Sequence, residues 1–407
     1  MNSNVEVLRK RAGLTQTELS QRAGISRRAL SSIEKSVSIP SVDIALKLAA
    51  CLNTTVESLF DRGEKDISEN LNDSSKDTYF ATQMENSKWD HFRFIDLFAG
   101  IGGIRLGFEG VGGRCVFSSE IDEDACKTYE ANFGEHPSGD ITLIETKEIP
   151  DFDILLAGFP CQAFSIIGKK EGFANETSGT LFFEIERILR DKQPPAFMLE
   201  NVRNLVAHDN GNTFRVIREH LNALGYHVYA KVLNALDYGV PQKRERIIIV
   251  GFLDDVKFTY PEPIPEDERT KLADILEESV DSKYYVRDVI RESRLERIND
   301  KNYPRPYISH ENIAGTVTPH PYSSALRAGA SANYILINDE RRPTEREMLR
   351  IQGFPDSFKI VVPYGKIRKQ CGNSVPVPMI QAVAKQMIRA LKEYEYVENN
   401  ASQDEEE

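Results

Sequence analysis

Apolar residues repeat at helical spacing along roughly the first sixty positions of the chain. The repeat is broken about every ten residues by glycine or by a residue that favours a helix start, such as Thr15 or Ser26. Thr15 and Glu18 have the spacing of a capping box, in which the two residues satisfy backbone N–H groups reciprocally. The pattern predicts a unit of five short helices over residues 1–61, with Gly24 in the turn between the second and third helices.

The periodic pattern stops after residue 61. Residues 62–91 are polar and acidic and show little periodicity. A segment of this composition cannot bury enough apolar surface to fold, and its charges repel one another. We therefore predict a flexible linker there and an acidic disordered tail over residues 395–407.

From residue 92 onward, short apolar runs alternate with stretches of helical periodicity. Such alternation indicates an α/β fold with a largely parallel sheet. It ends near residue 253, and the following residues up to 333 are rich in proline, tyrosine and charged side chains. The predicted strands lie at residues 94–99, 115–119, 152–157, 196–199 and 247–250, and the predicted helices at 124–132, 181–189, 344–350 and 377–391.

Composition narrows the class of protein. The chain has 407 residues, enough for two or three domains, and it lacks an apolar run of about 18 residues that could cross a membrane. Its five cysteines show no C-x-x-C spacing, which argues against a disulfide framework and against a structural zinc site. We predict a cytoplasmic protein with reduced thiols, without a metal site and without membrane contact.

The net charge of −12 argues against a nucleic-acid partner, because phosphate binding depends on lysine and arginine. The distribution of the charges changes that interpretation. Acidic residues are concentrated over residues 61–90 and 404–407, whereas arginine and lysine gather in the short motifs described below. Net charge therefore decides little about the partner.

A glycine-rich turn follows the first predicted strand. Gly100 and Gly102 allow a ligand to approach the backbone closely, and Glu120, about 20 positions later, suits the hydroxyl pair of a ribose. A basic P-loop residue is absent from the turn, so a nucleoside without a triphosphate fits better than a nucleotide. A purely structural role for the turn is the alternative.

A thiol and a carboxyl group follow two other predicted strands. Cys161 comes after the strand at 152–157, and Glu200 comes after the strand at 196–199. Parallel strands end at the same edge of a sheet, so the two groups could share one cleft. A free cysteine more often simply packs, so its assignment as a nucleophile depends on such partners.

Two arginines, Arg244 and Arg246, stand at alternate positions before the strand at 247–250. Alternation along an extended chain sends both to one side, where two guanidinium groups could converge on a carboxylate, a phosphate or a pyrimidine carbonyl. A solvated edge strand is the alternative interpretation.

Residues 1–61 resemble the phage-repressor type of helix-turn-helix domain over their whole length. The resemblance is carried by two short helices, the turn at Gly24 between them and the five-helix unit that surrounds them. It implies that Gln16, Arg27 and Arg28 face DNA. A helical module that docks another protein is the alternative.

Six motifs, in order, resemble those of the DNA cytosine-5 methyltransferases from about residue 92 to residue 391. Each motif is short, but six in order leave little room for another family. The motifs are Phe-Ala-Gly-Ile-Gly-Gly at 98–103, Pro-Cys-Gln at 160–162, Glu-Asn-Val at 200–202, Gln-x-Arg-x-Arg at 242–246, Arg-x-Gln-Gly-Phe-Pro at 350–355 and Gln-Cys-Gly-Asn-Ser-Val at 370–375.

This resemblance implies a Rossmann-like sheet that binds S-adenosylmethionine. Glu120 would hold the ribose hydroxyls, and Asp140 would contact the adenine amino group. Asn373 with Ser374 would close the methionine side. The residues implied to bind the cofactor are Phe98, Gly100, Gly102, Glu120, Asp140, Asn373 and Ser374.

The resemblance also implies the catalytic residues. Cys161 is the implied nucleophile. Glu200 and Arg246 would hold the target ring, and Arg244 would orient the loop and ring contacts nearby. Carbon C5 of cytosine is a poor nucleophile, and a thiolate that adds at C6 converts the ring into an enamine that can accept a methyl group. Because C6 lies inside the stacked duplex, the base must be flipped out.

Two further regions are implied to contact DNA. Gln162 and Ser165 begin a loop that closes on the flipped base, and they would fill or contact the vacated space. Residues 253–333 correspond to the target-recognition region of the family. The candidate base readers there are Thr316, Tyr322 and Arg327.

These inferences give a function and a domain division to test. The expected protein is a DNA cytosine-5 methyltransferase of a type II restriction–modification system, which binds duplex DNA and represses its own operon through its first domain. A dimer formed through that domain is left open. A DNA-binding regulator with an inactive methyltransferase body and a tRNA cytosine-5 methyltransferase are the alternatives. The expected parts are a helix-turn-helix domain at 1–61, the linker at 62–91, a large domain at 92–252, a small domain at 253–364, a segment returning to the large domain at 365–394 and the tail at 395–407.

Overall fold

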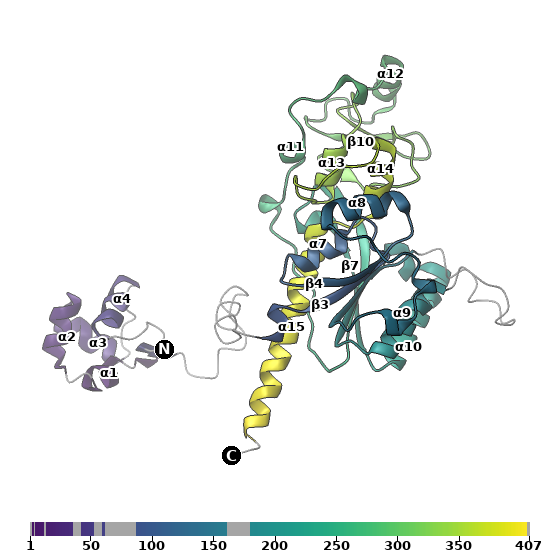
Figure 1. The fold of residues 1–407 in the computed structure, drawn as a ribbon. Coiled ribbons are helices and arrows are strands. Elements are labelled where there is room, and N and C mark those ends of the chain that lie inside the picture. The colour runs from purple at the N-terminus through teal and green to yellow at the C-terminus, as the bar shows by residue number, and fades with distance from the viewer. Residues whose placement is uncertain are drawn as a thin grey trace. The chain divides into compact units, whose positions relative to one another are not determined.

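The computed structural model describes residues 2–3, 5–11, 14–35, 42–52, 59–61, 87–160 and 180–404. They belong to two compact units, one within Met1–Glu85 and the other within Asn86–Glu407. Figure 1 shows the helices and strands of both units. Within the described ranges, no helix combines the length and the apolar character that a membrane crossing needs.

The first unit is a small helical bundle. Thr15 caps α2, and its predicted capping box with Glu18 is confirmed. Ser26 caps α3, and Gly24 adopts a left-handed conformation in the turn before it. The segment before β2 that was expected to hold the fifth helix lies mostly outside the described residues, which resume at Leu59. The elements are α1 (Val5–Arg11), α2 (Gln16–Ala23), α3 (Arg27–Glu34) and α4 (Val42–Cys51), with the paired strands β1 (Asn2–Ser3) and β2 (Phe60–Asp61).

A six-stranded sheet forms the centre of the second unit. Its order is β4-β3-β5-β6-β9-β7, in which β9 runs antiparallel to both neighbours and the other pairs are parallel. The expected Rossmann-like α/β fold is therefore confirmed. Gly158 at the end of β5 lies opposite Glu200 in β6, so these two strands end at one edge. The strands are β3 (Arg93–Leu97), β4 (Arg114–Ser119), β5 (Ile154–Gly158), β6 (Ala196–Val202), β7 (His227–Asn234) and β9 (Glu245–Phe252).

Helices cover both faces of this sheet (Figure 1). Phe94 in β3 packs in an apolar cluster with α7 and α15, whereas its neighbour Ile95 packs in a second cluster with α9 and α10. Burial on both faces explains why the central strands are apolar nearly throughout. The helices are α7 (Gly103–Glu109), α8 (Glu123–Phe133), α9 (Thr180–Lys192), α10 (Asn212–Ala223) and α15 (Val377–Asp404).

The chain beyond β9 builds a smaller lobe, and α15 then returns it to the main sheet. The lobe has an antiparallel sheet of order β11-β10-β13, while β12 pairs in parallel with β8. A capping box between Thr344 and Glu347 begins α13, in agreement with the helix predicted over 344–350. The elements are β8 (Gln242–Lys243), α11 (Leu272–Ile275), α12 (Asp288–Arg297), β10 (Ile308–Glu311), β11 (Val317–His320), β12 (Ser323–Ser324), β13 (Ile335–Ile337), α13 (Glu345–Ile351) and α14 (Tyr364–Asn373).

Candidate active site

A pocket of about 400 Å³ opens at the edge where the parallel strands end. Residues that follow β3 and β4 line it together with residues at the ends of β5 and β6 and at the end of α14. This is the edge at which open α/β sheets bind ligands. The predicted residues that line the pocket are Phe98, Gly100, Glu120, Asp140, Glu200, Arg244, Arg246, Asn373 and Ser374.

The turn after β3 brings backbone to one wall of the pocket. Phe98 has a φ of 59° and Gly100 a φ of 56°, in the left-handed region that glycine alone adopts freely. Gly102 is not among the residues that line the pocket. With a φ of 81°, it lies where an added Cβ would come within 2.3 Å of the Phe133 ring. Gly100 therefore borders the pocket, whereas Gly102 allows the start of α7 to pack against α8.

Glu120 is held in place by backbone donors. Its Oε1 accepts hydrogen bonds from the N–H groups of Ile121 and Asp122, each over 2.8 Å. Its Oε2 accepts from the N–H of Gly100, also over 2.8 Å. A carboxylate offers about four acceptor positions, so Glu120 keeps acceptor capacity after these three bonds. It is therefore oriented and still able to bind a hydroxyl group.

Glu200 and Arg246 form an ion pair in the same pocket. Arg246 Nε lies 2.8 Å from Glu200 Oε1, and the two side chains are only 14% and 10% exposed. The N–H is not aligned for a hydrogen bond, and Oε1 has no hydrogen-bond partner among the described residues. A carboxylate with free acceptor capacity beside a guanidinium can receive N–H groups of a ring while the guanidinium donates to a carbonyl.

Arg244 is tied to three backbone carbonyls. Its guanidinium donates to the carbonyl oxygens of Leu326 over 2.8 Å, Gly372 over 3.0 Å and Ser374 over 2.6 Å. Burial, together with the nearby charge of Arg246, lowers the pKa of Arg244 to about 9. The side chain joins the β8–β9 segment to the smaller lobe and to the residues after α14. Its contacts shape the pocket wall.

Asn201 is a residue whose role its motif did not predict. Its side chain is buried, and its Nδ2 donates to the carbonyl of Phe159 over 2.9 Å. Phe159 and Pro160 both line the pocket. Asn201 therefore holds the segment that leads to Cys161 against the end of β6. The available signal was an amide at the end of a buried strand, because a buried amide requires a partner.

Asp96 in β3 is a fully buried acid inside an apolar strand. Its carboxyl oxygens have no well-aligned hydrogen bond within the described ranges, and the backbone N–H of Arg105 provides only a weak one. Burial raises the pKa of Asp96 to about 7 against the attraction of Arg105, with smaller contributions from Glu120 and Glu109. This group is therefore protonated over part of the neutral pH range.

Replacing Asp96 by asparagine is expected to change the pH dependence of stability. The unfolded chain releases this proton near pH 4, whereas the folded chain keeps it until about pH 7, so the wild-type free energy of unfolding falls over that range. As the pH rises from about 5.5 to about 7, the free energy of unfolding of Asp96→Asn should therefore increase by about 2 kcal/mol relative to that of wild type. Urea denaturation at both pH values measures this difference, and a difference that does not vary with pH would contradict the raised pKa.

The predicted nucleophile Cys161 and the loop residues Gln162 and Ser165 lie outside the described residues. Pro160, the last described residue before them, lines the pocket. The structure therefore describes the site as far as Pro160, the residue directly before Cys161.

The predicted base readers lie in the smaller lobe and are not among the residues that line the pocket. Thr316 and Arg327 are exposed. Tyr322 stacks on His320 with ring centroids 5.1 Å apart and ring planes within 10° of parallel. Exposed polar side chains of these types are suited to contact with bases.

Within the helix-turn-helix unit, the predicted DNA contacts have different surroundings. Gln16 Nε2 donates to Glu34 Oε2 over 2.7 Å, and Glu34 also pairs with Arg9 over 2.7 Å. Arg27 is exposed at the start of α3, and Arg28 follows it in the same helix. The side chain of Gln16 thus makes an internal contact, whereas α3 presents an exposed cation.

Comparison with known proteins decides the family. The sequence model for C-5 cytosine-specific DNA methylases matches residues 92–389. The chain is 58% identical over 302 residues to the type II methyltransferase M.HaeII of Haemophilus aegyptius. The matched region covers 74% of this chain and 94% of that protein. The chain belongs to the C-5 cytosine-specific DNA methylase family. A helix-turn-helix family also matches residues 5–59 of the methylase.

Other relatives agree with this membership. The methylase is 57% identical over 296 residues to the type II methyltransferase M.NgoBI of Neisseria gonorrhoeae, covering 72% of this chain and 92% of that protein. Its fold resembles the DNMT2 of Spodoptera frugiperda, with a TM-score of 0.56 and 21% identity over 72% of this chain and 98% of that one. The fold also resembles the S. pombe Dnmt2 methyltransferase, with a TM-score of 0.56 and 19% identity over 75% of this chain and 99% of that one. The methylase is thus a DNA cytosine-5 methyltransferase with a helix-turn-helix segment, as its motifs predicted.

Proposed function

We propose that this methylase transfers a methyl group from S-adenosylmethionine to C5 of a cytosine flipped out of one specific duplex DNA sequence. It would do so as the modification enzyme of a type II restriction–modification system, since its relatives are type II methyltransferases. The observation that carries the proposal is the single pocket shared by Glu120 and the Glu200–Arg246 pair. One pocket could thus hold a nucleoside cofactor beside a target base.

The residues of the pocket fit S-adenosylmethionine. Glu120, oriented by backbone donors, would hold the ribose hydroxyls. Asp140 would contact the adenine amino group, and Asn373 with Ser374 would close the methionine side, where Arg244 binds the Ser374 carbonyl. When bound, S-adenosylmethionine supplies the methyl group. The other residues proposed for this site are Phe98 and Gly100 at the pocket wall and Gly102 behind it.

Cys161 is the proposed nucleophile. Its thiolate sulfur bonds to C6 of cytosine, and the electron pair of the C5–C6 double bond moves into the ring toward N3 and O2. Glu200 would pass a proton to N3 and accept from the exocyclic amine, and Arg246 would donate to O2, so that the two side chains neutralise that charge. Carbon C5 of the resulting enamine would then take the methyl group, whose bond to the sulfonium sulfur of the cofactor breaks with its electron pair staying on sulfur. Loss of the C5 proton then returns electrons to the C5–C6 bond and expels the thiolate.

The free thiol of a cysteine has a pKa of about 8.5, so Cys161 needs a positive setting to react at neutral pH. Arg246, 2.8 Å from Glu200 in the pocket, and the buried Arg244 are cations that would supply it. Removing the cytosine from the stacked helix costs a few kcal/mol. Gln162 and Ser165 are proposed to occupy or border the vacated space.

We assign the reading of the target sequence to the smaller lobe. Thr316 and Arg327 are exposed there, and Tyr322 forms a stacked pair with His320. A guanidinium can bind guanine in two places at once, and hydroxyl groups can bind several base edges. These residues would therefore discriminate bases around the methylated cytosine, and the lobe would correspond to the small domain expected at 253–364.

Methyl transfer from labelled S-adenosylmethionine tests the proposal, with mixed-sequence duplex DNA and tRNA as separate substrates. We expect label in duplex DNA and one recurring sequence context after bisulfite sequencing. Label in tRNA alone would identify a tRNA methyltransferase. Label in neither substrate would leave a DNA-binding regulator with an inactive methyltransferase body.

The helix-turn-helix unit is proposed to repress the methylase's own operon by binding its promoter, as a dimer where the operator has two half-sites. The match of a helix-turn-helix family to residues 5–59 and the exposure of Arg27 on α3 support this assignment. The unit has its own apolar core around Leu19, Leu30 and Leu48. It can therefore be removed without opening the core of the methylase unit.

Removing residues 1–61 is expected to abolish promoter binding and to leave the methylation rate within about threefold of the full chain, because the two units are separately compact. Gel-shift titration on the promoter fragment and methyl transfer to duplex DNA measure the two effects. Arg27→Ala in the full chain should weaken promoter binding alone. Loss of methylation in the shortened chain would instead give the unit a catalytic or docking role.

A further inference from the structure

The small sheet of the methylase has two different faces. Its register pairs His310 with Thr318 and Glu311 with Val317, and successive residues along a strand point to opposite faces. His310 and Thr318 therefore share one face, which we call the outer face. Ser309 and Glu311 share the other, which we call the inner face.

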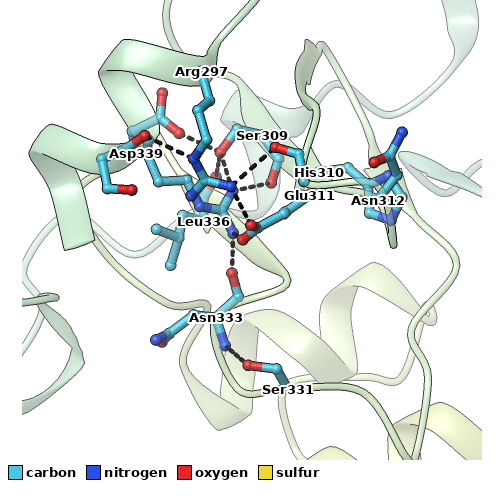
Figure 2. Close-up of polar contacts among 12 residues, drawn as sticks. Arg297, Ser309, His310, Glu311, Asn312, Ser331, Asn333, Leu336 and Asp339 are labelled. Carbon is cyan, nitrogen blue, oxygen red and sulfur yellow. Dashed lines mark hydrogen bonds and ion pairs between the residues drawn. The ribbon is translucent and has the colours of Figure 1, made fainter.

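Arg294 of α12 lies against the inner face, with its side chain 1% exposed. Its Nη1 donates to Ser309 Oγ over 3.0 Å, and its Nη2 donates to the carbonyl of Asn333. Nη2 also lies 3.3 Å from Glu311 Oε2. Figure 2 shows Ser309, Glu311 and Asn333 gathered around these contacts. One side chain thus fixes β10 and the loop before β13 to α12.

A buried carboxylate completes the network behind Ser309. Ser309 Oγ donates to Asp339 Oδ1 (Figure 2). The hydroxyl of Tyr307 donates to Asp339 Oδ2 over 2.8 Å. Asp339 is fully buried at a φ of 61°, a conformation that a residue other than glycine holds only when its surroundings enforce it. The charge of Arg294 is thereby balanced by Glu311 and, through Ser309, by Asp339.

Asn333 connects this network to Arg327. The residue after it, Tyr334, places its ring 4.8 Å from the Arg327 guanidinium, and its hydroxyl accepts from the backbone N–H of Arg327 over 3.0 Å. Arg327 Nη2 also lies 3.5 Å from Nε2 of His310, on the outer face. A fixed Asn333 carbonyl therefore fixes the ring on which the exposed Arg327 lies.

Arg297, one turn further along α12, holds the neighbouring turn. Its Nη1 contacts the Glu311 carboxylate and donates to the carbonyl of Gly315 over 2.9 Å. Gly315 immediately precedes Thr316 and the start of β11. The same helix thus anchors the two places that carry Thr316 and Arg327.

We propose that Arg294 is a positioning residue for target recognition, which ties Ser309 and Asn333 to α12 and so holds Arg327 and the outer face in one arrangement. This inference rests on the proposed function, because it concerns the DNA that the active site would methylate. Burying a guanidinium costs desolvation, and a well-packed apolar side chain often stabilises a core equally well. The buried charge is therefore better explained by the geometry that its hydrogen bonds enforce.

The test compares Arg294→Met with wild type on a duplex library randomised around the target cytosine and read by bisulfite sequencing. We expect the preference for the target base to fall by about tenfold or more at one or more positions. KM for DNA should rise, while kcat at saturating DNA and Kd for S-adenosylmethionine stay within about twofold. Ser309→Ala, a smaller change in the same network, should shift the preference in the same direction.

Arg291→Met provides the matched control, because Arg291 lies on the same helix with a half-exposed side chain, 3.9 Å from Glu340. Arg291→Met should keep the base preference, KM and kcat of wild type. Folded Arg294→Met and Ser309→Ala proteins with wild-type preference would overturn the proposal, as would a fall in kcat alone. If Arg294→Met does not fold, an unchanged preference in Ser309→Ala overturns the proposal and a relaxed preference supports it. A wild-type chain that methylates no duplex DNA would refute the proposed function, and this inference with it.

Discussion

Replacing Glu200 by glutamine is expected to lower the rate of methyl transfer, at saturating DNA and cofactor, by about 10²–10³-fold. Glutamine has nearly the same size and keeps one acceptor oxygen, but its amide cannot pass a proton to N3. Glu200 Oε1 has no hydrogen-bond partner among the described residues and lies 2.8 Å from Arg246 Nε. The substitution therefore removes the proton donor proposed to neutralise charge on the ring, and single-turnover methyl transfer measures the effect.

Glu245→Gln is the matched control, since Glu245 lies beside Arg246 in the chain but pairs with Arg203 over 2.7 Å at the surface. Its rate should equal that of wild type. Cofactor binding should be unchanged in both variants, because Glu120 holds the ribose side of the pocket. If Glu200→Gln retained its rate within about threefold, the proposed electrostatic role of Glu200 would be wrong.

Replacing Arg244 by methionine is expected to destabilise the methylase unit by about 3–5 kcal/mol, because it leaves buried carbonyl groups without a donor. Those carbonyls belong to Leu326 in the smaller lobe, Gly372 in the last turn of α14 and Ser374 directly after α14. Urea denaturation followed by the fluorescence of Trp89 measures the change. Trp89 is the single tryptophan of the chain and is buried in the methylase unit.

Arg203→Met is the control for Arg244→Met. Arg203 forms a surface ion pair with Glu245, which should contribute less than about 1 kcal/mol. The Arg244 variant should also bind S-adenosylmethionine more weakly, because the Ser374 carbonyl loses its donor. A loss of stability below about 1 kcal/mol would show that other contacts hold the two lobes together.

The sequence predicted the parts of the fold in which local pattern and burial agree. Continuous apolar runs identified β3, β5, β6 and the centre of β9, because these strands are buried on both faces. The capping box at Thr15 identified the start of α2, since both of its hydrogen bonds are local. The spacing of Gly100 and Glu120 predicted a nucleoside site; both residues line one pocket, where the N–H of Gly100 donates to Glu120.

The features that the sequence did not predict depend on distant contacts or on exposure. β7 is an edge strand whose burial is interrupted, so it lacks the continuous apolar run that marks its neighbours. α15 continues to Asp404, beyond the predicted end at residue 391; residues 396–400 are exposed, so no buried apolar repeat marks this part of the helix. The side chain of Gln16 donates to Glu34, 18 positions away, a contact that no local pattern predicts. A local pattern likewise does not predict the contacts of Arg244 with residues 82 to 130 positions away.

Covalent trapping tests most directly the central claim that Cys161 attacks C6 of a cytosine bound in this pocket. Duplex DNA with 5-fluorocytosine at the target position carries no C5 proton, so β-elimination is blocked and the adduct persists. We expect the wild-type chain with S-adenosylmethionine to form a protein–DNA complex that survives denaturation, and Cys161→Ser to form none. Methylation of ordinary DNA without any trapped complex, or equal trapping by Cys161→Ser, would contradict the account.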